Sequence, residues 1–231
     1  MDTPSPLVLH LEEVIAEKHL LNHPFYKHWS AGTLPREVMR EYAKQYYHLE
    51  KNFPRLLSRV HTHSDDPKVR QVLSENMHDE EYGEKNHREL WLRFAEALGL
   101  AREDVETSEA LPETKATLVS LMEACEKGTL SGIGALSAYE SQIPAVAESK
   151  IAGLKEHYGI TEERGTEFFR LHGVVDVEHS NAWWNIIDER ATTEEAKAET
   201  EAGVVQGRDA LWSFLDGVCA AYFPQAAMAL C

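Results

Sequence analysis

Residues 172 to 179 read His-Gly-Val-Val-Asp-Val-Glu-His, and the rest of the chain is best understood as a scaffold around them. If the stretch is helical, His172, Asp176 and His179 follow one another at intervals of four and three residues and share one face. Two imidazoles and a carboxylate on one face are ligands that a first-row transition metal accepts. Such a triplet can also arise on a solvated helix, because the chain holds 12 His and 39 acidic residues.

A second pair of possible ligands lies upstream, in the stretch Asp-Glu-Glu-Tyr-Gly-Glu-Lys-Asn-His that ends at His87. Glu80 and His87 stand seven residues apart, about two helical turns, and we expect them on one side of a helix. Glu81 would point about 100° away from Glu80, so Glu80 is the expected ligand of the two. The flanking acidic residues also allow a simpler interpretation, an acidic solvated surface.

Glu140 is the third candidate, because it lies in an apolar and small-residue run from Ile133 to Ile143. A carboxylate in such surroundings needs a partner. Together the three segments offer three His and three carboxylates, enough for two metal ions if water and bridging oxygens complete the coordination. Pro144 follows four residues later and is expected to bend the helix, either for packing alone or to aim Glu140 into a bundle.

Composition sets the outer limits. The chain has 231 residues, which favours one domain spanning 1–231, and no run of 18 apolar residues that could cross a membrane. Its net charge of -16 argues against nucleic acid or an anionic membrane as a partner. The three cysteines are odd in number and lack metal-like spacing, so we expect no disulfide framework and a cytoplasmic location.

The chain is expected to be all-α, since no alternating strand pattern is visible. Pro54 is predicted to kink the second long helix, and the helix that carries Glu80 is predicted to be broken or bent near Gly83. Residues 101 to 112 are expected to be a connection. The predicted helices cover residues 7–21, 24–29, 33–61, 67–98, 112–127, 130–158, 161–187 and 193–222.

The six possible ligands, in their order along the chain, resemble the ligand set of the haem-oxygenase-like dimetal oxidases. Three further stretches resemble one group of that family, which includes the chlamydial protein associating with death domains and its bacterial relatives. The resemblance covers about residues 7 to 218, and we assign no role to the last dozen residues. The three stretches are Phe25-Tyr26-x-x-Trp29-Ser30-x-Gly32, Tyr42-Ala43-Lys44-x-Tyr46-Tyr47 and Tyr139-Glu140-Ser141-Gln142-Ile143-Pro144.

The resemblance implies a bundle of about seven helices that holds two metal ions, Fe/Fe or Mn/Fe, and activates O2 with electrons from an external reductant. It also implies synthesis of p-aminobenzoate for folate, with the protein as its own substrate. Tyr26 then matches the sacrificed tyrosine, Lys150 the amine donor, and Tyr42 with Trp91 the redox-active aromatics. By composition alone these four residues are ordinary packing or solvated side chains. We also expect a homodimer.

Other functions remain open at this point. A dimetal oxidase acting on a free amino acid or lipid would use the same ligands but would need a pocket and many turnovers. The scaffold also hosts metal-free enzymes, including thiamin-salvage hydrolases with a catalytic Cys and a quinone-cofactor oxidase, but Cys125 has no recognisable nucleophile setting. A protein-interaction module that binds death domains is the third class, although it would leave six ligands without a purpose.

Overall fold

The computed structural model describes residues 4–223, and within that range every regular element is a helix. The all-α prediction is therefore confirmed. Within the same range no helix is both long and apolar enough to cross a membrane. Cys231 and most of the C-terminal tail lie outside the described residues.

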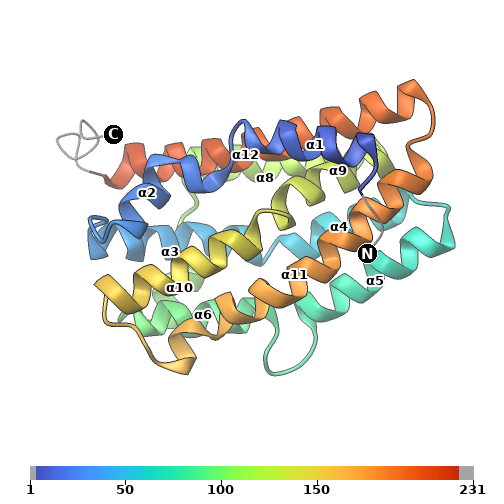
Figure 1. Cartoon of the computed structure of the whole chain (residues 1–231). Coiled ribbons are helices and arrows are strands. Elements are labelled where there is room, and N and C mark those ends of the chain that lie inside the picture. The colour runs from blue at the N-terminus through green and yellow to red at the C-terminus, as the bar shows by residue number, and fades with distance from the viewer. Residues whose placement is uncertain (1–3, 224–231) are drawn as a thin grey trace.

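Twelve α-helices and one 3-10 helix make up the described chain (Figure 1). The short helix predicted at 24–29 and the helix predicted at 112–127 are both found. The elements are α1 Pro6–Ala16, η1 Leu20–Asn22, α2 Pro24–Ser30, α3 Arg36–Glu50, α4 Phe53–His63, α5 Pro67–Glu81, α6 His87–Ala97, α7 Arg102–Glu106, α8 Pro112–Lys127, α9 Thr129–Glu140, α10 Ile143–His157, α11 Glu163–Arg190 and α12 Glu194–Tyr222.

The long helices predicted at 33–61, 67–98 and 130–158 are each divided into two. Pro54 and Pro144 do not bend a continuous helix, because each lies in the first turn of a new one, α4 and α10. Proline suits that position, since its missing N–H would have no intrahelical acceptor there. The divisions matter for function because they place helix ends, rather than helix middles, in the centre of the bundle.

Smaller differences concern two other segments. The first helix ends at Ala16 instead of continuing to residue 21, and a 3-10 turn follows it. The connection predicted at 101–112 contains the short helix α7. Neither difference changes the fold class.

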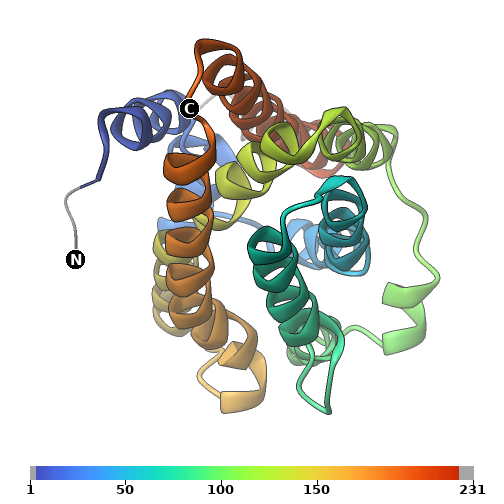
Figure 2. The same cartoon turned by 90° about the vertical axis from the view of Figure 1, so that its right-hand side faces the viewer.

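The helices pack as a bundle around α11, which lies against α10 and α6 and also contacts α9 and α5. Figures 1 and 2 show α11, in orange, running beside α10 and α5. On the other side α12 runs along α8 and α9. A long helix that packs against several others can present several of its residues to one interior site.

The contact between α9 and α12 depends on glycine. A Cβ at Gly207 would stand 2.6 Å from the carbonyl oxygen of Ala135, and one at Gly203 would overlap the backbone of Ser131. Real Cβ atoms do not come this close, so the two backbones can meet only because these positions have no side chain. This close packing fixes α9, whose last residue is Glu140.

Candidate metal centre

The end of α3, the α5–α6 connection, the end of α9 and the middle of α11 meet inside the bundle. The potential metal-ligating side chains brought there form two groups whose ligand atoms all lie within 4.8 Å of one another. The first group is Glu50, His87 and His172, and the second is Glu140, Asp176 and His179.

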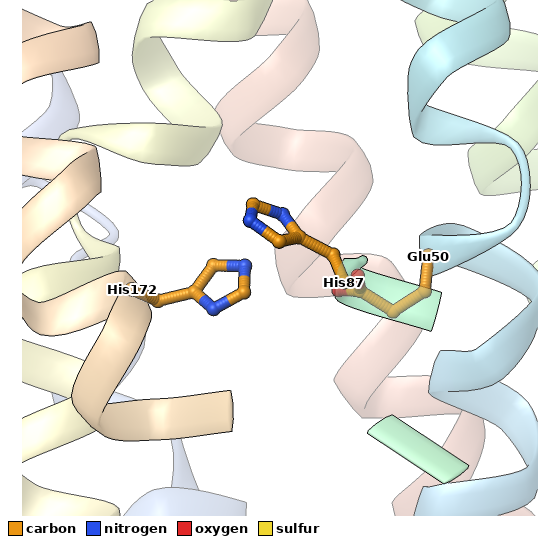
Figure 3. A group of neighbouring side chains, drawn as sticks. All are labelled: Glu50, His87 and His172. Atoms are coloured by element: carbon orange, nitrogen blue, oxygen red, sulfur yellow. The ribbon is translucent and has the colours of Figure 1, made fainter. Parts of the chain in front are cut away.

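In the first group, His87 from α6 and His172 from α11 turn their rings toward each other, while Glu50 reaches in from α3 (Figure 3). The two ring centroids are 4.1 Å apart. Nδ1 of His172 lies 2.7 Å from the carbonyl oxygen of Phe168. This contact fixes Nδ1 as the protonated nitrogen and leaves Nε2 with a free lone pair, the state needed for a metal ligand.

The second group is held by neighbours from α5 and α11. Nδ1 of His179 is 3.4 Å from Oε1 of Glu140 and 3.7 Å from Oδ1 of Asp176. The Asn76 side-chain amide donates to Oε1 of Glu140 at 2.9 Å, and the Trp183 indole N–H donates to the other oxygen. These two donors orient the Glu140 carboxylate toward His179.

Glu80 lies beside the first group. Its Oε1 is 2.8 Å from Nδ1 of His87, but the oxygen lies off the direction of a ring N–H bond, so that nitrogen has no hydrogen-bond partner within residues 4–223. Glu80 is buried, whereas Glu81 is exposed. The structure therefore brings Glu80, and not Glu81, to the candidate centre.

Burial and neighbouring negative charges raise the pKa of one carboxyl group in each ligand group. Burial first, and then the Glu80 charge, raise the pKa of Glu50 well above its ordinary value. Burial also raises the pKa of Asp176 to about 7, with Glu140 and Glu80 adding to the shift. The charge of Glu80 thus acts on one carboxylate of each ligand group.

The pKa values of His87 and His179 shift against the effect of burial, whereas burial lowers the pKa of His172 well below its usual value. Burial alone would lower the pKa of His87, but the Glu80 carboxylate outweighs it and raises the pKa to about 9. Burial likewise lowers the pKa of His179, but Asp176 and Glu140 outweigh this effect and raise the pKa to about 10. A divalent ion would replace these protons as the partner of the carboxylates.

Three of the carboxylates lie at the C-terminal ends of helices, and this position favours bound metal ions. Glu50 is the last residue of α3, Glu140 is the last residue of α9, and Glu80 lies in the last turn of α5. The C-terminus of a helix carries partial negative charge, so three carboxylates placed there and buried need positive charge nearby. The Nδ1 atoms of His87 and His179 make no hydrogen bond within residues 4–223 and are further possible ligand positions. Two divalent cations would satisfy both requirements.

Glu80 and His87 do meet, but the prediction that they lie on one side of a single helix is wrong. They are not on one face of one helix, because α5 ends at Glu81 and α6 begins at His87. Gly83 lies in the connection between them. Its φ of 85° is a backbone conformation that glycine adopts without strain. The chain turns there and brings the end of one helix against the start of the next.

Sequence reasoning missed Glu50 altogether. A signal was present, since Glu50 follows Tyr42 and Tyr46 at intervals of four residues and so continues their face of α3. Both tyrosines are buried. A carboxylate on an otherwise aromatic and buried face needed a partner, just as Glu140 did.

The four residues linked to catalysis by resemblance form one buried cluster. Nζ of Lys150 donates to the Tyr42 hydroxyl at 2.7 Å, and the hydroxyls of Tyr42 and Tyr26 are 3.3 Å apart. Nζ also lies 5.4 Å from the centre of the Tyr26 ring and 5.5 Å from that of Trp91. Burial lowers the pKa of Lys150 from 10.5 to about 7.

This cluster is continuous with the first metal-ligand group. The Tyr42 and Trp91 ring centroids are 6.0 Å apart, those of Trp91 and Phe168 are 4.8 Å apart, and those of Phe168 and His172 are 3.9 Å apart. Lys150 reaches this interior because α10 starts anew at Ile143 instead of continuing α9. Oxidation at the candidate centre could therefore reach Tyr26 through packed aromatic rings.

Cys125 has none of the features of a nucleophile. It is buried, and burial raises the pKa of its thiol to about 12. A thiol of that kind is almost wholly protonated at neutral pH. A hydrolase that depends on Cys125 does not agree with this environment.

Comparison with known proteins agrees with the fold and shows the family. Residues 40–212 match the model of a family described as iron-containing redox enzymes. A 4-aminobenzoate synthase from Nitrosomonas europaea is 41% identical over 90% of this chain and 89% of its own. One from Chlamydia muridarum is 39% identical over 89% of this chain and 87% of its own. A solved domain from Shewanella denitrificans with a heme oxygenase-like fold aligns with a TM-score of 0.81, 21% identity and 93% coverage of both chains, and therefore shows the fold.

Proposed function

Because this chain belongs to the family of iron-containing redox enzymes, we propose that it forms p-aminobenzoate by an O2-dependent oxidation at a pair of first-row metal ions. The relatives named 4-aminobenzoate synthase support the product, since they resemble this chain over nearly its whole length. The two groups of possible ligands support the metal pair. The ions are iron with iron or manganese with iron.

In this proposal Glu80, His87 and His172 hold one ion, and Glu140, Asp176 and His179 hold the other. Bound there, two such ions would activate O2 with electrons from an external reductant. The protein's part is to position the carboxylates and imidazoles. Asn76 and Trp183 hold Glu140, and the carbonyl of Phe168 holds His172.

We propose further that the protein is its own substrate, with Tyr26 supplying the ring and Lys150 the amino nitrogen. Both side chains are buried, which keeps water away from an oxidised ring. With a pKa of about 7, Lys150 is uncharged in roughly half of the molecules at neutral pH, and a neutral amine has the lone pair that nitrogen transfer requires. Tyr42 and Trp91, which lie between Tyr26 and His172, would carry the oxidation.

The observation that carries this proposal is the hydrogen-bonded series from Lys150 through Tyr42 to Tyr26, closed off inside the aromatic cluster. A lysine that served only packing would not have its amine among the rings of Tyr26, Tyr42 and Trp91. The distance of 5.4 Å between Nζ of Lys150 and the centre of the Tyr26 ring supports Lys150 as the proposed nitrogen donor and Tyr26 as the proposed ring source.

The test uses metal-loaded protein with reductant and O2 and without any added aromatic compound. We expect release of p-aminobenzoate, and its loss in both Tyr26→Phe and Lys150→Arg. The matched controls are Tyr47→Phe, a buried tyrosine, and Lys155→Arg, an exposed lysine of α10, and both should retain the product. Full product formation in Tyr26→Phe and Lys150→Arg would refute the self-consuming reaction.

One feature favours a second candidate, a dimetal oxidase that acts on a free small molecule. A cavity of about 740 Å³ has a mixed lining of apolar and charged residues, which includes Leu90, Leu171, Asp79 and Glu167, and it reaches one possible ligand, His87. Its size is that of ordinary small-molecule sites, which run from about 300 to 1,000 Å³. Many turnovers per chain on an added amino acid or lipid would identify this function instead.

A further inference from the structure

Glu50 has no role in the reaction as described so far, yet its environment is unusual. It is 5% exposed, and its carboxylate makes no hydrogen bond or ion pair with any residue in the range 4–223. Leaving a buried carboxylate unpaired is costly, and folded proteins normally give it a partner. The missing partner is therefore expected to be something other than a side chain of this chain.

The neighbours of Glu50 identify the kind of partner. Its carboxylate oxygen, a ring nitrogen of His87 and a ring nitrogen of His172 lie within 4.8 Å of one another (Figure 3). Ligand atoms about 2.1 Å from a common ion stand roughly 3 to 4 Å apart. The three atoms thus surround a space that a first-row divalent ion would fill after small side-chain adjustments.

Charge leads to the same conclusion. Three carboxylates, Glu80, Glu140 and Asp176, leave two divalent ions with one positive charge in excess. Glu50 supplies a fourth carboxylate, and the centre becomes neutral without a further anion. A neutral arrangement is the one that a buried site tolerates best.

A route for an ion to Glu50 is also present. A cavity of about 80 Å³ is lined by the buried carboxylates Glu50 and Glu80 and by the exposed residues Lys51, Glu81 and Arg88. Its volume has room for a few water molecules but not for a drug-sized ligand. Glu50 therefore stands where an ion coming from the surface would first meet the site.

We propose that Glu50 is a direct ligand of the ion held by His87 and His172, so that this ion has two carboxylates of its own, Glu50 and Glu80. The inference rests on the proposed function, because it presumes that a metal pair is bound. It goes beyond that function by adding a ligand to one of the two ions. With Glu50, one ion would have two histidines and two carboxylates, and the other would have one histidine and two carboxylates.

The experiment measures metal binding without turnover. Chelator-treated protein is titrated with Mn²⁺ in the absence of O2, and free Mn²⁺ is followed by electron paramagnetic resonance. Wild-type protein should bind two ions. Glu50→Gln should bind one ion as wild type does and the other at least about tenfold more weakly. Glu81→Gln, which changes an exposed carboxylate of the same cavity, is the matched control and should bind two ions with wild-type affinity.

Thermal melting distinguishes a ligand from a structural carboxylate. Without metal, Glu50→Gln should melt at or above the wild-type temperature, because an unpaired buried carboxylate has been removed. With Mn²⁺, its rise in melting temperature should be smaller than that of wild type. Glu50→Met, which removes the carboxylate without burying an amide, should give the same two results and replaces the Gln variant if that variant is unfolded.

The outcomes separate this inference from the function on which it rests. Two ions bound with unchanged affinity by Glu50→Gln and Glu50→Met, with a full rise in melting temperature, would overturn the role of Glu50 and leave the metal pair intact. A wild-type protein that binds no Mn²⁺ and no Fe²⁺ would overturn the metal pair itself, and the role of Glu50 with it.

Discussion

Replacing Lys150 by Met should raise the free energy of unfolding of the metal-free protein. This gain should be smaller at higher pH. The folded state holds Lys150 with a pKa of about 7 against an ordinary 10.5, so between those values the unfolded chain binds a proton that the folded chain gives up. Wild-type stability therefore rises with pH over that window. The lowered pKa of Lys150 therefore reduces the free energy of unfolding by about 4 kcal/mol at pH 7 and by about 2 kcal/mol at pH 9.

Loss of the hydrogen bond to Tyr42 costs Lys150→Met roughly 1 kcal/mol, but that cost is nearly the same at both pH values. The difference between the stability gains at the two pH values is therefore nearly independent of this hydrogen bond. Urea unfolding of both proteins at pH 7 and pH 9 should show the advantage of Met falling by about 2 kcal/mol. Lys155→Met, at an exposed position of the same helix, is the control. An advantage that does not change with pH would show that Lys150 is not held in a desolvated site.

Three further outcomes are expected. Glu80→Gln should lose at least one metal ion by elemental analysis while Glu81→Gln keeps both, and the reverse result would mean that the α5–α6 connection places the wrong carboxylate inside. Chelation should lower the melting temperature of the wild-type protein, because bound ions stabilise only the folded state, and an unchanged melting temperature would argue against a structural contribution of the metals. Gly207→Val should cost about 1 to 3 kcal/mol by forcing α9 and α12 apart, whereas Gly173→Ala, where a Cβ meets nothing within 4 Å, should be neutral or stabilising in the same urea assay.

The sequence predicted the helical class and most helices correctly because apolar spacing and caps are local signals. Asp66, for example, caps α5 by accepting from the Lys68 N–H, directly before Pro67. Whether proline bends a helix or begins a new one depends on packing against other helices, so Pro54 and Pro144 were placed correctly and interpreted wrongly.

The candidate site shows the same division between local and tertiary information. His172, Asp176 and His179 could be grouped from spacing alone, since all three are on α11. Glu80 and His87 meet through a turn between helices, which spacing cannot describe. Glu50 was missed because its partners, His87 and His172, come from two other helices. The closeness of Tyr26 and Lys150 likewise depends on where α9 ends and α10 begins.

Isotope tracing tests the central claim most directly. Protein expressed with ring-labelled tyrosine and ¹⁵N-lysine is loaded with metal and given reductant and O2, with no added aromatic compound. The self-consuming reaction predicts p-aminobenzoate that carries both labels, in no more than one equivalent per chain, and a spent chain altered at Tyr26 and Lys150. Unlabelled product, or product in many equivalents from chains of unchanged mass, would contradict it.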